Sequence, residues 1–205
     1  MYNRGKAKSL KHRLIELTVY SVVFAVIGGG TWFLDHEYNI FSDNVEYDRV
    51  IEKAALRHNL DSLLVKAVIW RESRFKPHAR GYAGEIGLMQ IMPKSATKAS
   101  VVEDWERANG VRIKSEGNLF YPETNIDIGA WYLARAIKHW EEYKYKYEIA
   151  LCEYNAGKSN VNKWVAGMEK HESILGRIQF ASTHDYVKAI MVKYHYYKTK
   201  ENEKY

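Results

Sequence analysis

The 205-residue sequence predicts a mainly α-helical domain behind one N-terminal transmembrane helix. Three observations lead to this fold class. An apolar stretch without formal charge runs from Leu17 to Leu34, apolar residues recur at helical spacing in several later segments, and the alternating pattern typical of strands is nearly absent. A chain of this length has room for one medium-sized domain with a core of its own.

The N-terminal segment has the charge pattern of a signal anchor. Five Lys or Arg residues lie within residues 1–13, and the 18 residues from Leu17 to Leu34 span about 27 Å as a helix, enough to cross a hydrocarbon core. Because basic flanks stay in the cytoplasm, the rest of the chain is expected on the periplasmic side of the cytoplasmic membrane. We therefore predict a cytoplasmic flank at 1–13, a single-pass anchor at 14–34, a tether at 35–44 and the folded domain at 45–200.

A cleavable signal peptide is the alternative interpretation, since Gly28 to Gly30 would supply small residues near a cleavage site. The apolar region is longer than is usual for a signal peptide, and Trp32 and Phe33 follow at once. A retained anchor is therefore favoured. A buried core helix fits less well, because this segment is apolar on every face.

Charge, cysteine and histidine content argue against several functional classes. Of the net charge of +6, residues 1–34 contribute +4, so the basic balance belongs mostly to the anchor flank and gives little support to nucleic-acid binding. Cys152 is the sole cysteine, which excludes an internal disulfide, and the eight His residues are scattered without a ligand set at metal-binding spacing. We expect no nucleic-acid partner, no metal and no cofactor.

Two helices are expected to open the folded domain. Residues 42–44, Ser-Asp-Asn, supply an N-cap for a first helix that runs to about His58, and residues 59–60 make the turn that follows. Asp61 is the expected N-cap of a second helix over residues 62–72, which contains no helix breaker.

Glu72, at the end of the second helix, is the candidate general acid. Val65, Val68 and Ile69 lie seven, four and three positions before it, which places its carboxylate on the buried stripe. Burial of a carboxylate in apolar surroundings raises its pKa, the condition for a general acid near neutral pH. The alternative is a glutamate that turns out to solvent and pairs with Arg71 or Lys76.

The remaining helices are expected at residues 94–102, 122–140, 147–153, 159–165 and 185–197. Residues 103–121 are polar and irregular, and we interpret them as a surface loop in preference to a flap. Glu123 and Asp127 lie in the first turns after Pro122, where acidic residues are favoured by the helix dipole. This position explains them structurally, so neither is a catalytic candidate.

Three separated motifs carry a family resemblance. They are Glu72-Ser73-x-Phe75-x-Pro77-x-Ala79, Gly84-x-x-Gly87-Leu88-Met89-Gln90-Ile91-Met92-Pro93 and Ala150-x-x-x-Tyr154-Asn155-Ala156-Gly157. In this order they resemble the SLT-type lytic transglycosylases of the goose-lysozyme-like superfamily. The resemblance extends from about Val50 to Tyr197 and implies a lysozyme-like helical domain.

The resemblance also implies a substrate and a reaction. The substrate would be the glycan strands of peptidoglycan, cleaved at the β-1,4 bond between N-acetylmuramic acid and N-acetylglucosamine. Glu72 would protonate the glycosidic oxygen and then, as a carboxylate, take a proton from the muramoyl 6-hydroxyl, which closes onto C1 to give a 1,6-anhydro product. The reaction needs no metal or cofactor. The family does not identify a protein partner in the cell-wall machinery.

Site roles follow from the resemblance position by position. Ser73 and Phe75 would set the turn after the acid, Met89 and Gln90 would line the sugar groove, and Tyr154 and Asn155 would bracket Glu72. Tyr186 matches a tyrosine of the closing helix. The predicted substrate-binding residues are therefore Ser73, Met89, Gln90, Tyr154, Asn155 and Tyr186.

Four positions depart from the family pattern. Gly81 replaces a serine found in many relatives, Glu85 stands where alanine is common, and Ser182 and His184 occupy positions of a glutamate and an arginine. Glu85 is either a second active-site carboxylate or, as we favour, a surface charge of the loop. These changes leave two alternatives open: a hydrolytic muramidase, and a wall-binding or scaffolding module with weak turnover.

Overall fold

The computed structural model describes residues 44–94 and 100–203, which belong to one compact unit that begins at Asn44. The predicted flank at 1–13, the anchor at 14–34 and nearly all of the tether lie outside the described residues. Within the described ranges, no helix is both long enough and apolar enough to cross a membrane.

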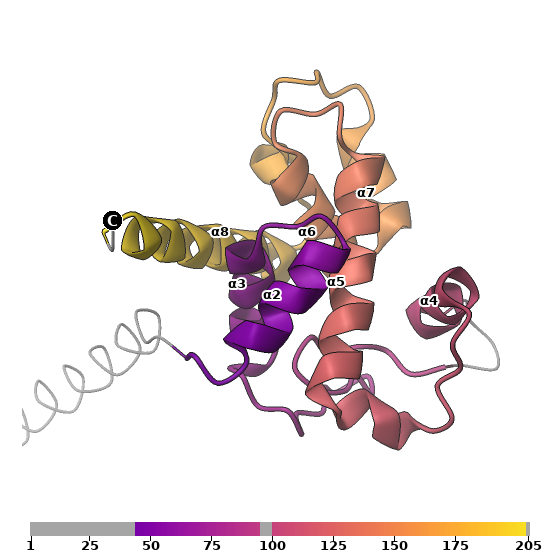
Figure 1. Cartoon of the computed structure of the whole chain (residues 1–205). Helices are drawn as coiled ribbons and strands as arrows, with labels where there is room; N and C mark the ends of the chain where they lie inside the picture. Colours follow the sequence, from indigo (N-terminus) through magenta and orange to yellow (C-terminus); the bar gives the residue numbers. More distant parts are fainter. Residues whose placement is uncertain (1–43, 95–99, 204–205) are drawn as a thin grey trace, which may run out of the picture. The chain divides into compact units, whose positions relative to one another are not determined.

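The described residues form a mainly helical fold (Figure 1), as the sequence predicts. Pairing between extended segments is limited there to isolated antiparallel bridges in the loop after α3. In chain order the elements are α2 (Asp48–Arg57), α3 (Ser62–Ser73), α4 (Val101–Asn109), the 3-10 helix η1 (Glu116–Phe120), α5 (Pro122–His139), α6 (Lys146–Ala156), α7 (Lys158–Val165), the 3-10 helix η2 (Ile174–Arg177) and α8 (Ala181–Asn202).

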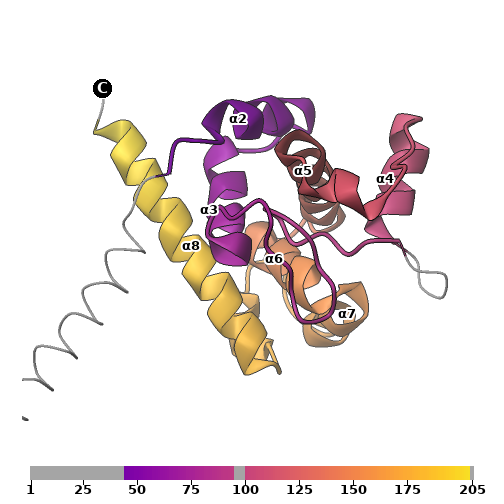
Figure 2. The ribbon, with the colours of Figure 1, turned by 90° about the horizontal axis from the view of Figure 1, so that it is seen from below.

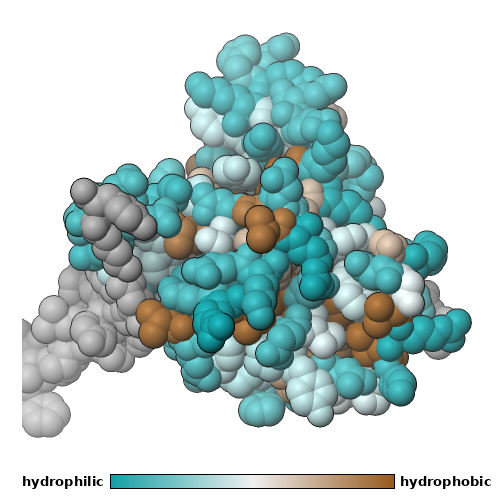
Figure 3. Space-filling view, in the orientation of Figure 1, coloured by the Kyte–Doolittle hydropathy of each residue, from teal (hydrophilic) through white to brown (hydrophobic). Residues whose placement is uncertain are grey.

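Helix α3 is the central element of the core. Its residues Leu64, Val65, Ala67, Val68 and Ile69 have no solvent-exposed surface. It packs against α2 and α8, and Figure 2 shows α8 running alongside it. Helix α5 packs against α2, α4 and α6, and α6 in turn packs against α8. On the face shown in Figure 3, apolar side chains are scattered among hydrophilic ones.

Local signals explain several helix ends. The Asp61 side chain accepts a hydrogen bond of 2.9 Å from the Leu63 N–H, which confirms it as the N-cap of α3. Pro122 occupies the first turn of α5, as expected. The N-cap predicted within residues 42–44 is wrong: α2 begins at Asp48, and the Asn44 side chain instead accepts from the Glu46 N–H in the turn before it.

The segment between Pro93 and Pro122 differs from the prediction. Residues 95–99, most of the helix predicted over 94–102, lie outside the described residues. The loop predicted over 103–121 is wrong, because α4 covers Val101–Asn109 and η1 covers Glu116–Phe120. Ser100 caps α4 through the Val102 N–H, and α4 packs against α5 with Val102 and Trp105 buried. A cap in a short segment with few apolar residues is a weak signal, which explains the error.

Asp127 has a structural role, but one that differs from the helix-dipole role expected from its position near the start of α5. It is buried in α5 and accepts a hydrogen bond of 2.8 Å from Arg57 and one of 3.0 Å from the Trp105 indole, while His58 lies at 2.9 Å. Burial alone would raise the pKa of this carboxyl, but its hydrogen bonds and the charges of His58 and Arg57 hold the pKa below its usual value. The carboxylate thereby joins α5 to α4 and to the end of α2.

Candidate active site

Glu72 lies in the last turn of α3, above the buried side chains of Val65, Val68 and Ile69. The residue as a whole remains partly exposed. Burial raises its pKa to about 7, against the opposing effects of a hydrogen bond from Tyr186 and the charge of Arg71, while the charge of Glu85 adds to the rise. The carboxyl is therefore suited to exchange a proton near neutral pH.

Tyr186 in α8 is the direct partner of Glu72. Its hydroxyl donates a hydrogen bond of 2.6 Å to Glu72 Oε1, and the tyrosine itself is only 2% exposed. Burial, followed by the charge of Glu72, raises the Tyr186 pKa well above its ordinary value, so the hydroxyl keeps its proton as a donor. The Arg71 guanidinium lies 5.4 Å from the centre of the Tyr186 ring and holds the ring from the α3 side.

The chain turns sharply after Glu72 into a segment that we call the site loop, residues 74–93. Arg74 and Phe75 have left-handed backbone conformations, with φ of 52° and 61°, and Phe75 is buried. The Ser73 hydroxyl donates to the carbonyl of Leu88 at 2.8 Å and lies 3.3 Å from that of Ile69. Ser73 therefore links α3 to the second half of the loop.

Asn125 of α5 fixes the second half of the site loop. Its side-chain oxygen accepts from the Met89 N–H at 2.7 Å, and its amide nitrogen donates to the carbonyls of Ile86 and Leu119 at 2.8 and 2.7 Å. Asn125 has no exposed surface. The sequence interpretation missed this residue. Its one signal was a polar side chain among the apolar positions of the predicted helix.

Gln90 adopts a left-handed conformation with φ of 48°. Its side-chain amide donates to the Gly87 carbonyl at 2.9 Å and reaches the Ala79 carbonyl at 3.4 Å. Ile86 and Ile91 exchange two backbone hydrogen bonds of 2.9 Å across the same turn. These contacts give Gln90 a fixed, half-exposed position beside the other residues of the loop.

The Tyr154-Asn155 motif approaches the site from α6. The Tyr154 hydroxyl donates a hydrogen bond of 2.9 Å to the carbonyl of Met89. Burial, followed by the charge of Glu72, raises the Tyr154 pKa well above its ordinary value, so the hydroxyl keeps its proton as a donor. The side chain of Asn155 accepts from the Thr183 hydroxyl at 2.7 Å and so joins α6 to the start of α8. Thr183, which is almost fully buried, was also missed by the sequence interpretation.

The structure thus brings one protonatable carboxyl, the buried Tyr186, the partly buried Tyr154 and the site loop together at the end of α3. A family profile described as "Transglycosylase SLT domain" matches residues 49–175. The chain belongs to the SLT transglycosylase family.

Individual proteins are similar to this SLT domain over different shares of their length. The soluble lytic murein transglycosylase of Salmonella typhimurium is 29% identical over 182 residues, which cover 86% of this chain and 26% of that protein. The membrane-bound lytic murein transglycosylase E of Buchnera aphidicola is 28% identical over 164 residues, covering 71% of this chain and 72% of that protein.

The crystal structure of the 70-kDa soluble lytic transglycosylase SLT70 from Escherichia coli matches with a TM-score of 0.70 and 26% identity, covering 87% of this chain and 28% of that one. The chain therefore spans about a quarter of the length of the soluble relatives. The likeness confirms the predicted helical, lysozyme-like fold of the SLT domain.

Two of the departures from the family pattern lie at the start of α8. Ser182 is exposed, and His184 lies 3.5 Å from the carboxylate of its neighbour Asp185. Within the ranges that the structure describes, no group of His, Cys, Asp and Glu side chains is placed to hold a metal ion.

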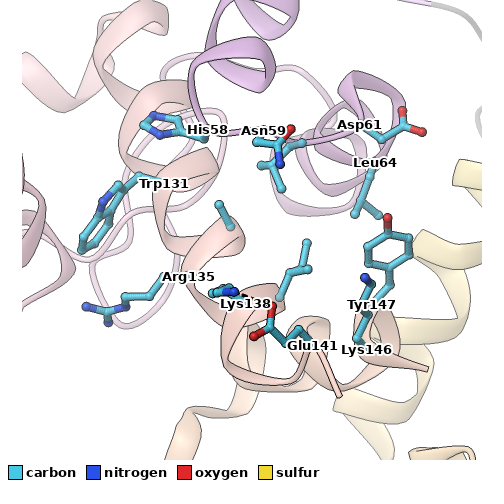
Figure 4. A pocket seen from close by; sticks show the side chains of 13 residues that line it. His58, Asn59, Asp61, Leu64, Trp131, Arg135, Lys138, Glu141, Lys146 and Tyr147 are labelled. Atoms are coloured by element: carbon cyan, nitrogen blue, oxygen red, sulfur yellow. Dashed lines mark hydrogen bonds and ion pairs between the residues drawn. The ribbon is translucent and has the colours of Figure 1, made fainter. Parts of the chain in front are cut away.

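A hollow of about 600 Å³ lies at the other end of α3. Figure 4 shows Asp61 and Tyr147 on one side of it and Trp131 and Arg135 on the other. Asp61 and Glu72 are about 16 Å apart along α3 at 1.5 Å per residue, and no residue of the Glu72 site lines this hollow. The hollow is therefore separate from the candidate active site.

Proposed function

We propose that the chain is a membrane-anchored lytic transglycosylase, which cleaves the β-1,4 bond between N-acetylmuramic acid and N-acetylglucosamine in peptidoglycan and forms a 1,6-anhydro-muramoyl product. The observation that carries the proposal is the environment of Glu72: a carboxyl with a pKa of about 7, held by the hydroxyl of a buried tyrosine. The names of the matched relatives, lytic murein transglycosylases, support the substrate class.

The first step is bond cleavage assisted by Glu72 as general acid. Its proton passes to the glycosidic oxygen, the bond from C1 to that oxygen breaks, and the bonding electrons leave with the oxygen. Because Tyr186 donates to Oε1, the acidic proton is expected on Oε2, the oxygen left free to face a substrate. A pKa of about 7 keeps much of Glu72 protonated at neutral pH without making proton release difficult.

The second step uses the same residue as general base. The Glu72 carboxylate takes the proton of the muramoyl 6-hydroxyl, whose oxygen forms a new bond to C1, and the enzyme regains its starting protonation state. Since the attacking hydroxyl belongs to the substrate itself, a second carboxylate to activate water is not needed. The substrate's acetamido oxygen would stabilise the cationic character at C1 between the two steps.

Binding is assigned to groups around the acid. Gln90 lies half-exposed on the loop that follows Glu72, and Asn155, exposed near the end of α6, comes directly after Tyr154. Ser73, Met89 and Tyr154 contribute mainly through internal hydrogen bonds: Ser73 and Met89 hold the loop, and Tyr154 ties the loop to α6. We propose that these five residues, with Tyr186, shape the sugar groove.

Anchoring by residues 14–34 is the other part of the proposal. It is supported by the apolar sequence after a basic flank and by the name of the Buchnera relative, which is described as membrane-bound. The expected location is the cytoplasmic membrane, with the SLT domain on the periplasmic side. Carbonate extraction of membranes, followed by protease treatment of spheroplasts, tests this: a retained anchor stays in the membrane pellet, and its SLT domain is digested from outside.

A hydrolytic muramidase is the second candidate, favoured by one observation. Glu85 is a second carboxylate, and its charge raises the pKa of Glu72. Most glycoside hydrolases use two carboxyl groups, one as the acid and the other as the base or nucleophile. Release of soluble muropeptides from purified sacculi by the full chain, with Glu72→Gln as the control, tests catalysis itself. Loss of release in the variant supports a glutamate-dependent enzyme, whereas sacculus binding without release by either protein would indicate a scaffold.

A further inference from the structure

Three side chains that make no contact with Glu72 form a group that we call the loop cluster: His78 and Arg80 of the site loop, and Phe120 of η1. The Arg80 guanidinium lies 4.9 Å from the centre of the Phe120 ring, and the centre of the His78 ring lies 5.6 Å from it. His78 and Arg80 are exposed, whereas Phe120 is half-buried. The loop cluster therefore presents a guanidinium and an imidazole to solvent beside an aromatic base.

The backbone beneath the loop cluster is fixed. Arg80 pairs with Ile86 in an antiparallel bridge of the site loop. The buried side-chain amide of Asn125 donates to the carbonyls of Ile86 and Leu119 at 2.8 and 2.7 Å. Because Phe120 follows Leu119 directly, this one amide sets the spacing between the segment that carries the guanidinium and the segment that carries the ring. The two groups are held together before a ligand binds, which lowers the entropy cost of binding.

Arg80 has no anionic partner among the residues that the structure describes. Arg57, in contrast, pairs with Asp127 at 2.8 Å. The Arg80 guanidinium has only an aromatic ring beside it, so its N–H donors remain available in the planar fork that matches both oxygens of a carboxylate. The loop cluster is therefore suited to a ligand that carries a carboxylate.

The loop cluster adjoins the proposed sugar groove. The side-chain amide of Gln90 reaches the Ala79 carbonyl at 3.4 Å, and Ala79 is the residue between His78 and Arg80. The Gly87 N–H donates to the same carbonyl at 2.9 Å. A glycan strand in contact with Gln90 therefore brings the groups attached to its sugars near the loop cluster.

The sugars of a glycan strand are uncharged, so the carboxylates of peptidoglycan belong to the stem peptides on its muramoyl residues. We propose that the loop cluster is a subsite for a stem-peptide carboxylate. Arg80 binds both carboxylate oxygens, His78 adds an N–H donor, and Phe120 holds the guanidinium in place. The chain then prefers strands with stem peptides over strands without them. The proposal rests on the function proposed above, because it takes peptidoglycan as the substrate.

The test compares glycan strands that carry stem peptides with the same strands after an amidase has removed the peptides. The preference is the ratio of kcat/KM for the first substrate to that for the second. Arg80→Gln should lower the preference by about 5-fold, the upper range for an exposed ion pair, chiefly through a higher KM on the peptide-bearing strands. Phe120→Leu should lower it as well, since the guanidinium loses its support. Arg49→Gln, which removes an exposed cation of α2, is the matched control and should leave the preference unchanged.

Binding to the Glu72→Gln chain gives a second readout that does not depend on turnover. Calorimetry in this background should show tighter binding to the peptide-bearing strands, and the addition of Arg80→Gln should remove the difference. Equal affinity for both strands would overturn the proposal, and so would loss of the difference with Arg49→Gln, which would indicate a general effect of charge. Equal weakening of both strands by Arg80→Gln would make Arg80 a sugar contact and overturn the stem-peptide subsite. If the unmodified chain cleaves neither strand, the proposed function fails, whereas the binding comparison still decides the role of Arg80.

Discussion

The Tyr186 hydroxyl lies 2.6 Å from Glu72 Oε1 and donates a hydrogen bond to it, although the two residues are 114 positions apart in the chain. This contact joins the end of α3 to α8. It favours the ionised form of Glu72, in opposition to the burial that raises the pKa of the carboxyl. The pKa of Glu72 is therefore set by burial, which raises it, and by the Tyr186 hydrogen bond, which lowers it. A change to either should shift the pH at which Glu72 titrates.

Tyr186→Phe should raise the pKa of Glu72 and move the alkaline limb of the pH profile to higher pH, because the change removes a hydrogen bond that favours the ionised form. The rate of cleavage at neutral pH should fall by about 10- to 100-fold. The hydrogen bond that orients the Glu72 carboxyl is lost, and a hydrogen bond to a charged group is worth about 1.5–3 kcal/mol. Tyr194→Phe is the matched control, since Tyr194 also lies in α8 but donates to Asp61 at the far end of α3. A profile that moves equally in both variants would refute a specific role for Tyr186.

The raised pKa of Glu72 also implies a cost in stability. A carboxyl whose pKa rises from 4.5 to about 7 on folding carries no penalty below the pKa of the unfolded state, and the penalty grows as the pH rises toward 7. Glu72→Gln should therefore be more stable than the unmodified chain at pH 8, by up to about 3 kcal/mol, since each pKa unit corresponds to about 1.4 kcal/mol.

Urea unfolding at pH 5 and pH 8 measures this difference. The gain in Glu72→Gln should shrink toward pH 5, and Glu52→Gln, on the exposed face of α2, should show no such pH dependence. A gain of the same size at both pH values would mean that the carboxyl is not desolvated as the structure indicates.

Asn125→Ala should destabilise the domain and impair cleavage together. The change removes three buried hydrogen bonds and leaves the Met89 N–H and two carbonyls without their partner, and each unsatisfied buried group costs about 1–3 kcal/mol. The Met89 N–H loses its acceptor, so faster hydrogen exchange is expected at the Met89 amide. The Met89 carbonyl also accepts from Tyr154, so loosening of this segment should impair cleavage as well. Asn160→Ala removes a single bond on α7 and is the control. Unaltered exchange at Met89 would contradict the role given to Asn125.

Asp127→Ala should lower stability without changing the pH profile of any remaining activity. The buried Asp127 carboxylate serves Arg57, His58 and Trp105, and loss of one partner from a buried charged network costs about 3–5 kcal/mol. Asp104→Ala, which removes a partly exposed carboxylate paired with Arg135, should cost less than about 1 kcal/mol. Denaturant unfolding separates the two. A shifted pH profile in Asp127→Ala would show that this carboxylate also acts on Glu72.

Features of the site that depend on helical spacing within one segment could be predicted from the sequence. Glu72 falls on the buried stripe of α3 because its spacing from Val65, Val68 and Ile69 is helical, and Asp61 caps that helix as expected. Pro122 likewise marks the start of α5. These features depend on neighbours within about two turns of helix, which a sequence displays directly.

The remaining part depends on tertiary convergence. Asn125 joins the site loop to η1 across separations of 36, 39 and 6 residues, and no local pattern marks its partners. The hydrogen bond from the Thr183 hydroxyl to Asn155 could not be predicted either, because it joins two helices that are 28 residues apart in the chain. The predicted anchor lies outside the described residues and stays a proposal.

Mass spectrometry of the products released from purified sacculi tests the central claim most directly. The full chain is compared with Glu72→Gln under identical conditions, after circular dichroism has shown that both are folded. The account predicts muropeptides one water lighter than hydrolytic products, formed only when Glu72 is present. Products with ordinary reducing ends would contradict the transglycosylase mechanism and identify a muramidase, and anhydro products formed equally by Glu72→Gln would contradict the assignment of the acid.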